Sequence, residues 1–168
     1  MVSGLIIRRE QDGDAVAIRR VHSASFPSVA EAALVDALRD SGHLSVSLVA
    51  LADDAIVGHV AFSPVSTATG AVGVGLAPVA VVPEARLCGV ASALVRAGVS
   101  ACAEAGCRWV VVLGDPGLYG RFGFTPAADV GLTDEYGGGA AFQVLELMPG
   151  SLPVGAGVVR YGPEFASL

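Results

Sequence analysis

The sequence has few charged residues and no long uninterrupted apolar run. Charged residues make up 15% of its 168 positions and hydrophobic residues 53%, so the chain has the composition of a folded domain. No stretch reaches the roughly 18 apolar residues of a membrane span. At the N-terminus, two arginines follow a short apolar run, and this order does not fit a signal peptide. We therefore expect a single cytoplasmic domain, residues 1–168, without a membrane partner.

Cysteines and basic residues are also scarce. The three cysteines, Cys88, Cys102 and Cys107, are odd in number and lack C-x-x-C spacing, which argues against a disulfide framework or a metal site. The formal net charge of −6 makes nucleic acid a poor partner, because phosphate binding needs a basic face. An acidic balance would suit a cationic substrate, although solubility alone also explains it.

Patterns of apolar residues predict an α/β domain. Pro27 separates two early helices, and Gly106 ends the helix with the clearest apolar stripe. Ser28 and Glu31 have the spacing of a capping box at the start of the second helix. Strands are predicted at 5–9, 44–52, 56–65, 76–82, 109–113 and 141–147, helices after Asp12 or Asp14, after Ser28, at 89–105 and at 118–122, and polar connections at 66–75 and 129–139.

The segment from Val79 to Ser92 carries the most chemical information. A buried strand ends at Pro83, and a short loop leads into the long helix at Gly89. The first amides of such a helix have no internal acceptors, and the helix dipole adds positive charge, so this end suits a pyrophosphate. Neither G-x-G-x-x-G nor Gly-Lys-Ser/Thr is present, which excludes Rossmann and Walker loops. A plain strand-to-helix turn remains the alternative.

Two motifs resemble those of the GCN5-related N-acetyltransferases. Arg86, Gly89 and Ala91 match the R/Q-x-x-G-x-G/A motif after a strand that ends in Val-x-Pro. The segment 111–124 looks like the strand and Tyr-x-x-x-Gly-Phe helix end of this superfamily. The residues of this segment are especially similar to those of a bacterial YhbS-like group. Four further segments fit the same group: Gly58-His59, Phe62-Ser63-Pro64, Leu76-Ala77-Pro78 and Leu145-Glu146-Leu147. The resemblance covers residues 5 to 165, in order.

The resemblance implies the acyl-CoA N-acyltransferase fold. This is a mixed, mostly antiparallel sheet with helices on both faces and a splayed central parallel pair, here 76–82 and 109–113. Acetyl-CoA, the co-substrate, would lie in the opening, with its pantetheine along the first strand and a backbone N–H on the developing oxyanion. The residues implied in binding it are Val79, Ala80, Val81, Arg86, Leu87, Cys88, Gly89, Val90, Ala91, Ser92, Tyr119 and Phe122.

The implied activity is acetyl transfer to a primary amine by direct attack in a ternary complex. A small-molecule amine is the favoured acceptor, and no metal or acyl-enzyme is needed. Two other functions stay open: a non-catalytic acyl-CoA-binding regulatory module, and acetyl transfer to a protein. The sequence also leaves a homodimer open.

Three side chains are candidates for proton transfer. Tyr119 matches the family position that protonates the departing thiolate, and a phenol with a reference pKa of about 10 holds its proton at neutral pH. Packing beside CoA is its alternative role. Glu31 is a candidate base, although the capping box would give it a structural task. His59 is a second candidate base, and a water chain is a third route.

Leu87 and Cys88 depart from the family pattern. Leu87 stands where a glycine is usual, and a left-handed backbone there would cost leucine roughly 1–2 kcal/mol. Cys88 stands where a basic residue is common. We expect its side chain to project beside the pyrophosphate, so that an arginine at this position would tighten CoA binding.

Overall fold

The computed structural model describes residues 4–168, so residues 1–3 of the N-terminal stretch considered above lie outside the described residues. Its helices are α1 (Ala15–Ser25), α2 (Ala30–Ser41), α3 (Val90–Glu104) and the short α4 (Pro116–Tyr119). Its strands are β1 (Ile6–Arg9), β2 (Val46–Ala52), β3 (Ala55–Thr67), β4 (Val72–Val81), β5 (Trp109–Leu113), β6 (Thr125–Pro126), β7 (Leu132–Asp134), β8 (Phe142–Glu146) and β9 (Gly157–Tyr161). Short 3-10 turns lie at Pro83–Ala85, Gly120–Phe122, Ala127–Val130, Gly139–Ala141 and Pro163–Ser167.

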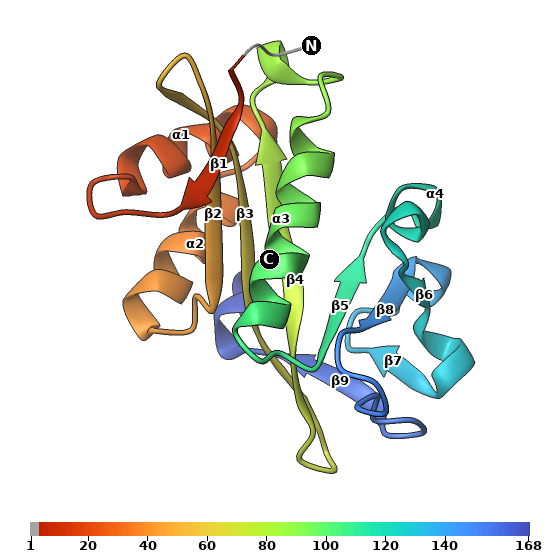
Figure 1. The fold of residues 1–168 in the computed structure, drawn as a ribbon. Coiled ribbons are helices and arrows are strands. Elements are labelled where there is room, and N and C mark those ends of the chain that lie inside the picture. Colours follow the sequence, from red (N-terminus) through yellow and green to blue (C-terminus); the bar gives the residue numbers. More distant parts are fainter. Residues whose placement is uncertain (1–3) are drawn as a thin grey trace.

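The strands form one mixed sheet in the order β1-β2-β3-β4-β5-β8-β6 (Figure 1). Strand β9 pairs with the end of β3 and with β7. Among the described pairs, β4–β5 and β7–β9 run parallel and the others antiparallel. The predicted α/β class and the mostly antiparallel sheet are therefore confirmed.

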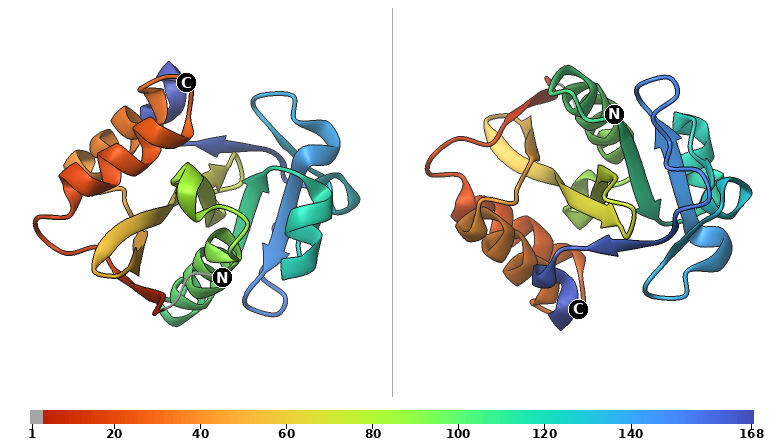
Figure 2. Two further views of the ribbon diagram at one scale, coloured as in Figure 1. Left: turned by 90° about the horizontal axis from the view of Figure 1, so that it is seen from above. Right: turned by 90° about the horizontal axis from the view of Figure 1, so that it is seen from below.

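Helices cover both faces of the sheet, as Figure 2 shows from two sides: α1 and α2 on one face and α3 on the other. Glycines let α3 approach β3 closely. A Cβ at Gly98 would overlap the ring of Phe62, and one at Gly58 would come within 2.9 Å of Leu94. Within residues 4–168, none of the helices has both the length and the apolar character to cross a bilayer.

Strands β4 and β5 pair over a very short length. Only Val74 with Val110 and Gly75 with Val111 are in register. Beyond them the two strands diverge, as the expected splayed pair requires (Figure 1). Opposite β3, β4 also carries a bulge, because Ala77 and Pro78 together face the single residue Ala61. The bulge therefore lies at the point where the strands separate.

Three local predictions were wrong. The segment 66–75 is not a connection, because β3 and β4 continue into a hairpin whose turn lies between Thr67 and Val72. The loop predicted at 129–139 contains strand β7, which pairs with β9. No side chain caps α2, which begins after Val29. The predicted capping box is therefore absent from this helix start.

Candidate active site

A cleft of about 630 Å³ lies beside the C-terminal part of β4 and the start of α3. It is lined by Ser25, Phe26, Val79, Ala80, Val81, Ala85, Arg86, Leu87, Gly89, Val90, Ala91, Ser92 and Arg121. Of the residues predicted to bind the cofactor, only Cys88, Tyr119 and Phe122 are missing from this lining. The loop between Pro83 and Gly89, here called the phosphate loop, and the edge of β4 thus line one cavity, as the sequence predicts.

The loop before α3 has a left-handed backbone at two residues. Leu87 has a φ of 62° and Gly89 a φ of 78°. Leu87 therefore has the left-handed backbone that strains a leucine. Because its side chain is fully exposed, no packing offsets this strain. The first helical bond runs from the N–H of Ala93 to the carbonyl of Gly89, and no side chain caps the helix. The preceding amides are consequently available to an anion in the cleft.

The backbone of β4 presents polar groups to the cleft. The N–H of Val82 donates to the carbonyl of Val57 on β3 at 2.9 Å. Because alternate residues of an antiparallel strand point to the same neighbour, Ala80 also points to β3, whereas Val79 and Val81 point to the opposite edge. At that edge β5 has already diverged. The N–H and C=O groups of Val79 and Val81 therefore face the opening.

The carbonyl of Val81 agrees with this pattern, because its partners do not belong to β3. It accepts from the hydroxyl of Ser25 at 3.0 Å and from Nε of Arg86 at 3.1 Å. A further bond of 3.4 Å joins Arg86 to the carbonyl of Ser25. The Arg86 side chain thus ties the loop to β4 and to the end of α1. Its contacts indicate that it shapes the phosphate loop.

Tyr119 is fixed at the end of α4. The carboxylate of Asp115 caps this helix by accepting from the N–H of Gly117 at 2.8 Å. The Tyr119 ring packs against Phe124, with centroids 5.8 Å apart, and lies so close to Gly114 that a Cβ there would overlap it. The side chain is 6% exposed, and burial raises the pKa of its phenol. The hydroxyl is therefore protonated at neutral pH.

A second cavity of about 500 Å³ contains both Tyr119 and Glu31. It is lined by Phe26, Ser28, Ala30, Glu31, Leu76, Ala77, Pro78, Val79, Val112, Leu113, Tyr119 and Leu168. Phe26 and Val79 also line the first cleft, so the two cavities adjoin. The structure therefore brings Glu31 and Tyr119 together at the point where β4 and β5 separate.

Glu31 does not perform the capping task that its spacing predicts. The hydroxyl of Ser28 accepts from the N–H of Ala30 at 3.1 Å, whereas the N-cap position belongs to Val29. Glu31 lies in the first turn of α2 and is half-buried. Its carboxylate is therefore free to serve the cavity that it lines.

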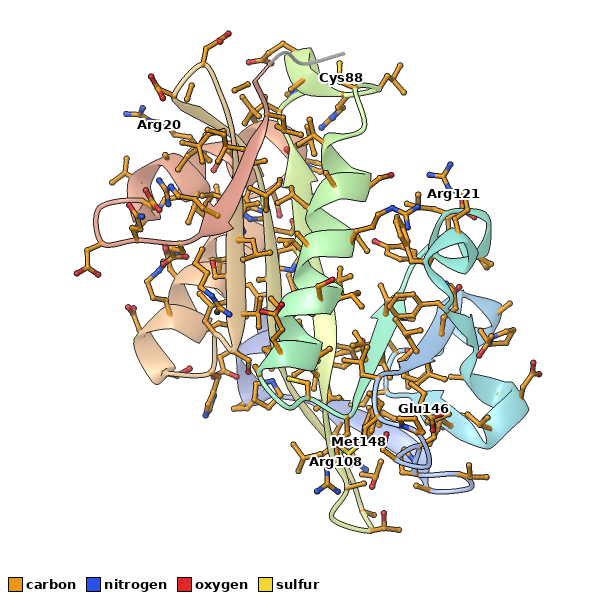
Figure 3. The ribbon with its side chains drawn as sticks, in the orientation of Figure 1. Arg20, Cys88, Arg108, Arg121, Glu146 and Met148 are labelled. Carbon is orange, nitrogen blue, oxygen red and sulfur yellow. The ribbon has the colours of Figure 1, made fainter. Side chains whose placement is uncertain are left out.

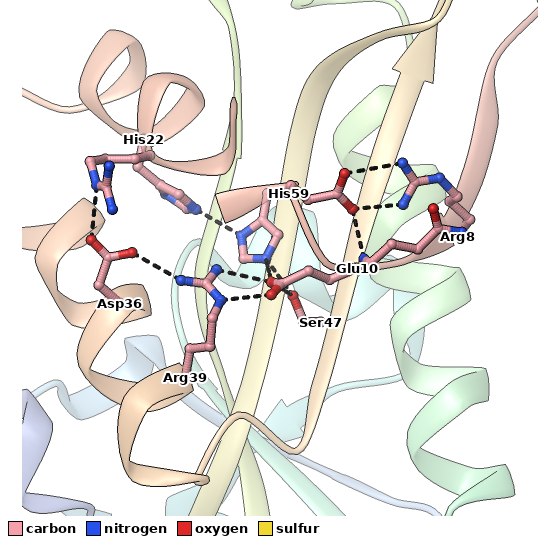
Figure 4. Close-up of polar contacts among 10 residues, drawn as sticks. Arg8, Glu10, His22, Asp36, Arg39, Ser47 and His59 are labelled. Carbon is pink, nitrogen blue, oxygen red and sulfur yellow. Dashed lines mark hydrogen bonds and ion pairs between the residues drawn. The ribbon is translucent and has the colours of Figure 1, made fainter. Parts of the chain in front are cut away.

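His59 lies elsewhere, in a buried polar network on the α1 and α2 side of the sheet (Figure 4). It is 0% exposed, and none of the described cavities is lined by it. Its Nδ1 is 2.8 Å from Nε2 of His22, and its Nε2 is 2.8 Å from the hydroxyl of Ser47. Burial lowers the pKa of His59 well below its ordinary value. The structure thus does not support a catalytic role for His59.

Cys88 and Phe122 also lie away from the cavity walls. Cys88 packs against the edge of the main core, and Phe122 packs under the guanidinium of Arg96 at 4.9 Å. Arg121, on the turn after α4, also lines the cleft; Figure 3 shows its side chain extending outward from that turn. The sequence did not single out Arg121, which occupies a variable position of the Tyr-x-x-x-Gly-Phe motif, or Phe26, which belongs to no motif.

Comparison with known proteins shows the family of the chain. Residues 15–124 match the Acetyltransferase (GNAT) family. The chain belongs to this family. Membership confirms the expected enzyme class, an acetyl-CoA-dependent acyltransferase. It also explains why a strand, a loop and a helix start line one cleft beside the cavity that holds Tyr119.

Similar proteins span nearly the whole chain. The "Uncharacterized N-acetyltransferase YhbS" of Escherichia coli strain K12 is 42% identical over 164 residues, which cover 96% of this chain and 98% of that protein. A crystal structure of YhbS from Escherichia coli in complex with CoA has a TM-score of 0.90 and covers 96% of this chain and 91% of its own. A GNAT acetyltransferase from Brucella melitensis in complex with acetyl-CoA is 37% identical, with a TM-score of 0.80 and coverage of 96% and 97%.

Proposed function

We propose that this protein transfers an acetyl group from acetyl-CoA to a primary amine by direct attack within a ternary complex. The observation that carries the proposal is the shared cavity of Tyr119 and Glu31, which adjoins the cleft beside the start of α3. The CoA and acetyl-CoA complexes of the two similar proteins support the choice of donor.

The donor binds mainly through backbone groups. Its pyrophosphate receives hydrogen bonds from the amides at the start of α3, where the helix dipole favours negative charge. Arg121 adds a positive charge from the opposite wall of the cleft. The pantetheine arm pairs with the outward-facing carbonyl of Val79 and N–H of Val81 as an added strand, because the carbonyl of Val81 already accepts from Ser25 and Arg86. This arrangement places the thioester in the second cavity, between Tyr119 and Glu31.

The reaction requires a neutral amine. An alkylamine has a pKa of about 10.4, so removing its proton at pH 7 costs roughly 4.6 kcal/mol. Glu31 receives this proton, directly or through a water molecule, because its carboxylate is the charged side chain of the cavity that contains Tyr119. The amine nitrogen then bonds to the thioester carbon.

The resulting tetrahedral intermediate carries an oxyanion, which the N–H of Val79 stabilises. When the intermediate collapses, the carbon–sulfur bond breaks, the nitrogen gives its second proton to solvent, and the CoA thiolate takes the proton of Tyr119. The products are the amide and CoA. Glu31 then releases its proton to solvent, and Tyr119 regains one from it. No acyl-enzyme forms, and Cys88, which lies outside both cavities, has no part in the chemistry.

Release of free thiol in the presence of a panel of amines tests this function. Thiol should form from acetyl-CoA at a rate that rises with amine concentration and falls strongly in Tyr119→Phe. Binding of acetyl-CoA without amine-dependent thiol release, for every amine in a broad panel, would instead support the non-catalytic acyl-CoA-binding module.

A further inference from the structure

A third cavity, of about 280 Å³, extends beyond the one that holds Tyr119. It is lined by Leu76, Ala77, Leu113, Tyr136, Tyr161, Phe165 and Leu168. Four of these residues also line the Tyr119 cavity, namely Leu76, Ala77, Leu113 and Leu168, so the two cavities adjoin over a shared wall. A molecule that reaches Tyr119 therefore has room to extend into a further compartment.

This compartment lies at the end of the cleft opposite the phosphate loop. Of the residues it shares with the Tyr119 cavity, Leu76 and Ala77 follow directly after Gly75, and Leu113 lies two residues after Val111, so they stand where the parallel strands stop pairing. None of the cavity-lining residues near the start of α3 belongs to it. A donor whose pyrophosphate lies at α3 would thus leave this compartment empty beyond its two-carbon acetyl group.

The outer wall of the compartment is held in place by Asp134. Its two carboxylate oxygens accept from the N–H of Tyr136 at 3.0 Å and from the N–H of Gly138 at 2.8 Å. Gly138 packs against Leu113 so tightly that a Cβ would overlap the leucine side chain. These contacts hold the loop from Asp134 to Gly138 against β5 and keep Tyr136 at the wall of the cavity.

The lining is aromatic and apolar. The rings of Tyr136 and Tyr161 have centroids 5.9 Å apart, and those of Tyr161 and Phe165 4.9 Å apart. Tyr136 is 53% exposed, so the compartment opens to solvent at this residue. Glu31 is the charged side chain among the described residues that line the Tyr119 cavity and the third compartment.

We infer that the third compartment is the acceptor subsite and that it selects small primary amines with an aromatic or branched apolar group close to the nitrogen. The inference rests on the proposed function. The amine nitrogen lies between Glu31 and Tyr119, and its apolar group lies among Leu113, Tyr136 and Tyr161. Polyamines are poorer substrates, because none of the described side chains that line the compartment is charged and the nearby Asp134 carboxylate is engaged by the N–H groups of Tyr136 and Gly138.

The geometry favours the amine over a long acyl chain as the occupant. The acceptor must enter from the end that the donor leaves open, and the exposed Tyr136 marks an entrance there. A pocket of about 280 Å³ also matches a single ring or branched chain better than an extended peptide. The occupant is therefore a metabolite-sized amine.

The test compares 2-phenylethylamine with 1,4-diaminobutane, using acetyl-CoA as donor. We expect kcat/KM for 2-phenylethylamine to be at least thirtyfold higher. In Tyr136→Ala its KM should rise about tenfold, whereas the KM for acetyl-CoA should stay unchanged. Tyr136→Phe should restore the lower KM. Val154→Ser, at an exposed residue outside the described cavities, is the matched control and should behave like the natural protein.

The outcomes separate the inference from the function on which it rests. Amine-dependent thiol release with equal kcat/KM for both amines, or with no effect of Tyr136→Ala, would overturn the acceptor subsite and leave acetyl transfer standing. If hexanoyl-CoA is used better than acetyl-CoA and Tyr136→Ala removes only that preference, the compartment holds an acyl chain and the inference is wrong. No thiol release with any amine would overturn the proposed function itself.

Discussion

The polar groups of the two halves of the sheet differ in their hydrogen bonding. Between β1–β3 and the helices α1 and α2, buried polar side chains are joined in a network, with Glu10 accepting from Arg39 and from Ser47 (Figure 4). Between β4 and β5, backbone groups of Val79 and Val81 face an open cleft. The contrast indicates that the first half supplies stability and the second half chemistry.

The network also has a direction. The hydroxyl of Ser47 donates to Glu10 at 2.7 Å, so its oxygen accepts from Nε2 of His59. Nδ1 of His59 must then accept from Nε2 of His22. Both histidines are neutral in this arrangement, in agreement with pKa values that burial lowers in both. Each partner thus has a fixed role, unlike the Tyr119 hydroxyl, which changes its protonation state in the proposed mechanism.

The largest expected effect is on the cleft side. Tyr119→Phe removes one proton donor and keeps the ring, so turnover should fall by about 10²–10⁴-fold while the affinity for acetyl-CoA stays nearly constant. Steady-state kinetics and calorimetric titration give the two quantities. A fall of less than threefold, under conditions where chemistry limits the rate, would mean that Tyr119 is a packing residue. The contrast between the halves would then lose its main support.

The second effect belongs to the network side and depends on pH. Burial lowers the pKa of His22 to about 4 from its ordinary 6.5. The unfolded chain therefore binds a proton at this residue below about pH 6.5, whereas the folded chain does so only near pH 4. Its stabilising contribution is complete above pH 6.5 and is lost as the pH falls toward 4, by roughly 3 kcal/mol in total.

Urea unfolding between pH 7 and pH 4 measures this loss. Because Asp14 and Glu164 also have lowered pKa values, the informative quantity is the difference from His22→Gln, which keeps a donor for His59 but no titrating ring. The variant should lose less stability on acidification. His43→Gln removes an exposed histidine that pairs with Glu164, so it measures how much that pair contributes to the pH dependence. Equal pH dependence in His22→Gln and the natural protein would contradict the assignment.

The third effect distinguishes side chains at the phosphate end. Arg121→Ala should weaken CoA binding about tenfold, and the difference should shrink with added salt, because an exposed charge pair is screened over about 10 Å at 0.1 M. Cys88→Arg, which the sequence predicts to tighten binding, should now leave affinity within about twofold, because Cys88 lies outside the cleft lining. Titration of both variants at two salt concentrations decides the matter. Tighter binding in Cys88→Arg alone would restore the original prediction.

The smallest effect concerns backbone strain. Leu87→Gly should raise the free energy of unfolding by about 0.5–1 kcal/mol, because relief of the left-handed strain exceeds the entropy that glycine loses on folding. Thermal unfolding should shift upward by a few degrees, roughly 2–4 °C. A downward shift would show that the exposed leucine stabilises the loop.

The motif residues, which line much of the first cleft, were predictable, and the residues that reach the cavities from other segments were not. Gly89 and Arg86 are recognised because backbone geometry at a helix start restricts residue types locally. The capping-box spacing of Ser28 and Glu31 was misleading, since the helix begins one residue later, at Ala30. His59 sits in a strand whose two faces the sequence does not distinguish, and it faces the buried network. Arg121 and Tyr136 reach their cavities from separate turns, so only the folded chain brings them there.

The outward-facing edge of β4 has a consequence for handling the protein. An unpaired strand edge is a template on which another chain can add, and natural sheets protect such edges. Here the edge at Val79 and Val81 lies inside a cleft that admits a thin, extended molecule and hinders a second sheet. A bound pantetheine arm would form hydrogen bonds with this unpaired edge. In the proposed complex, the donor would therefore also protect β4 from pairing with a strand of another molecule.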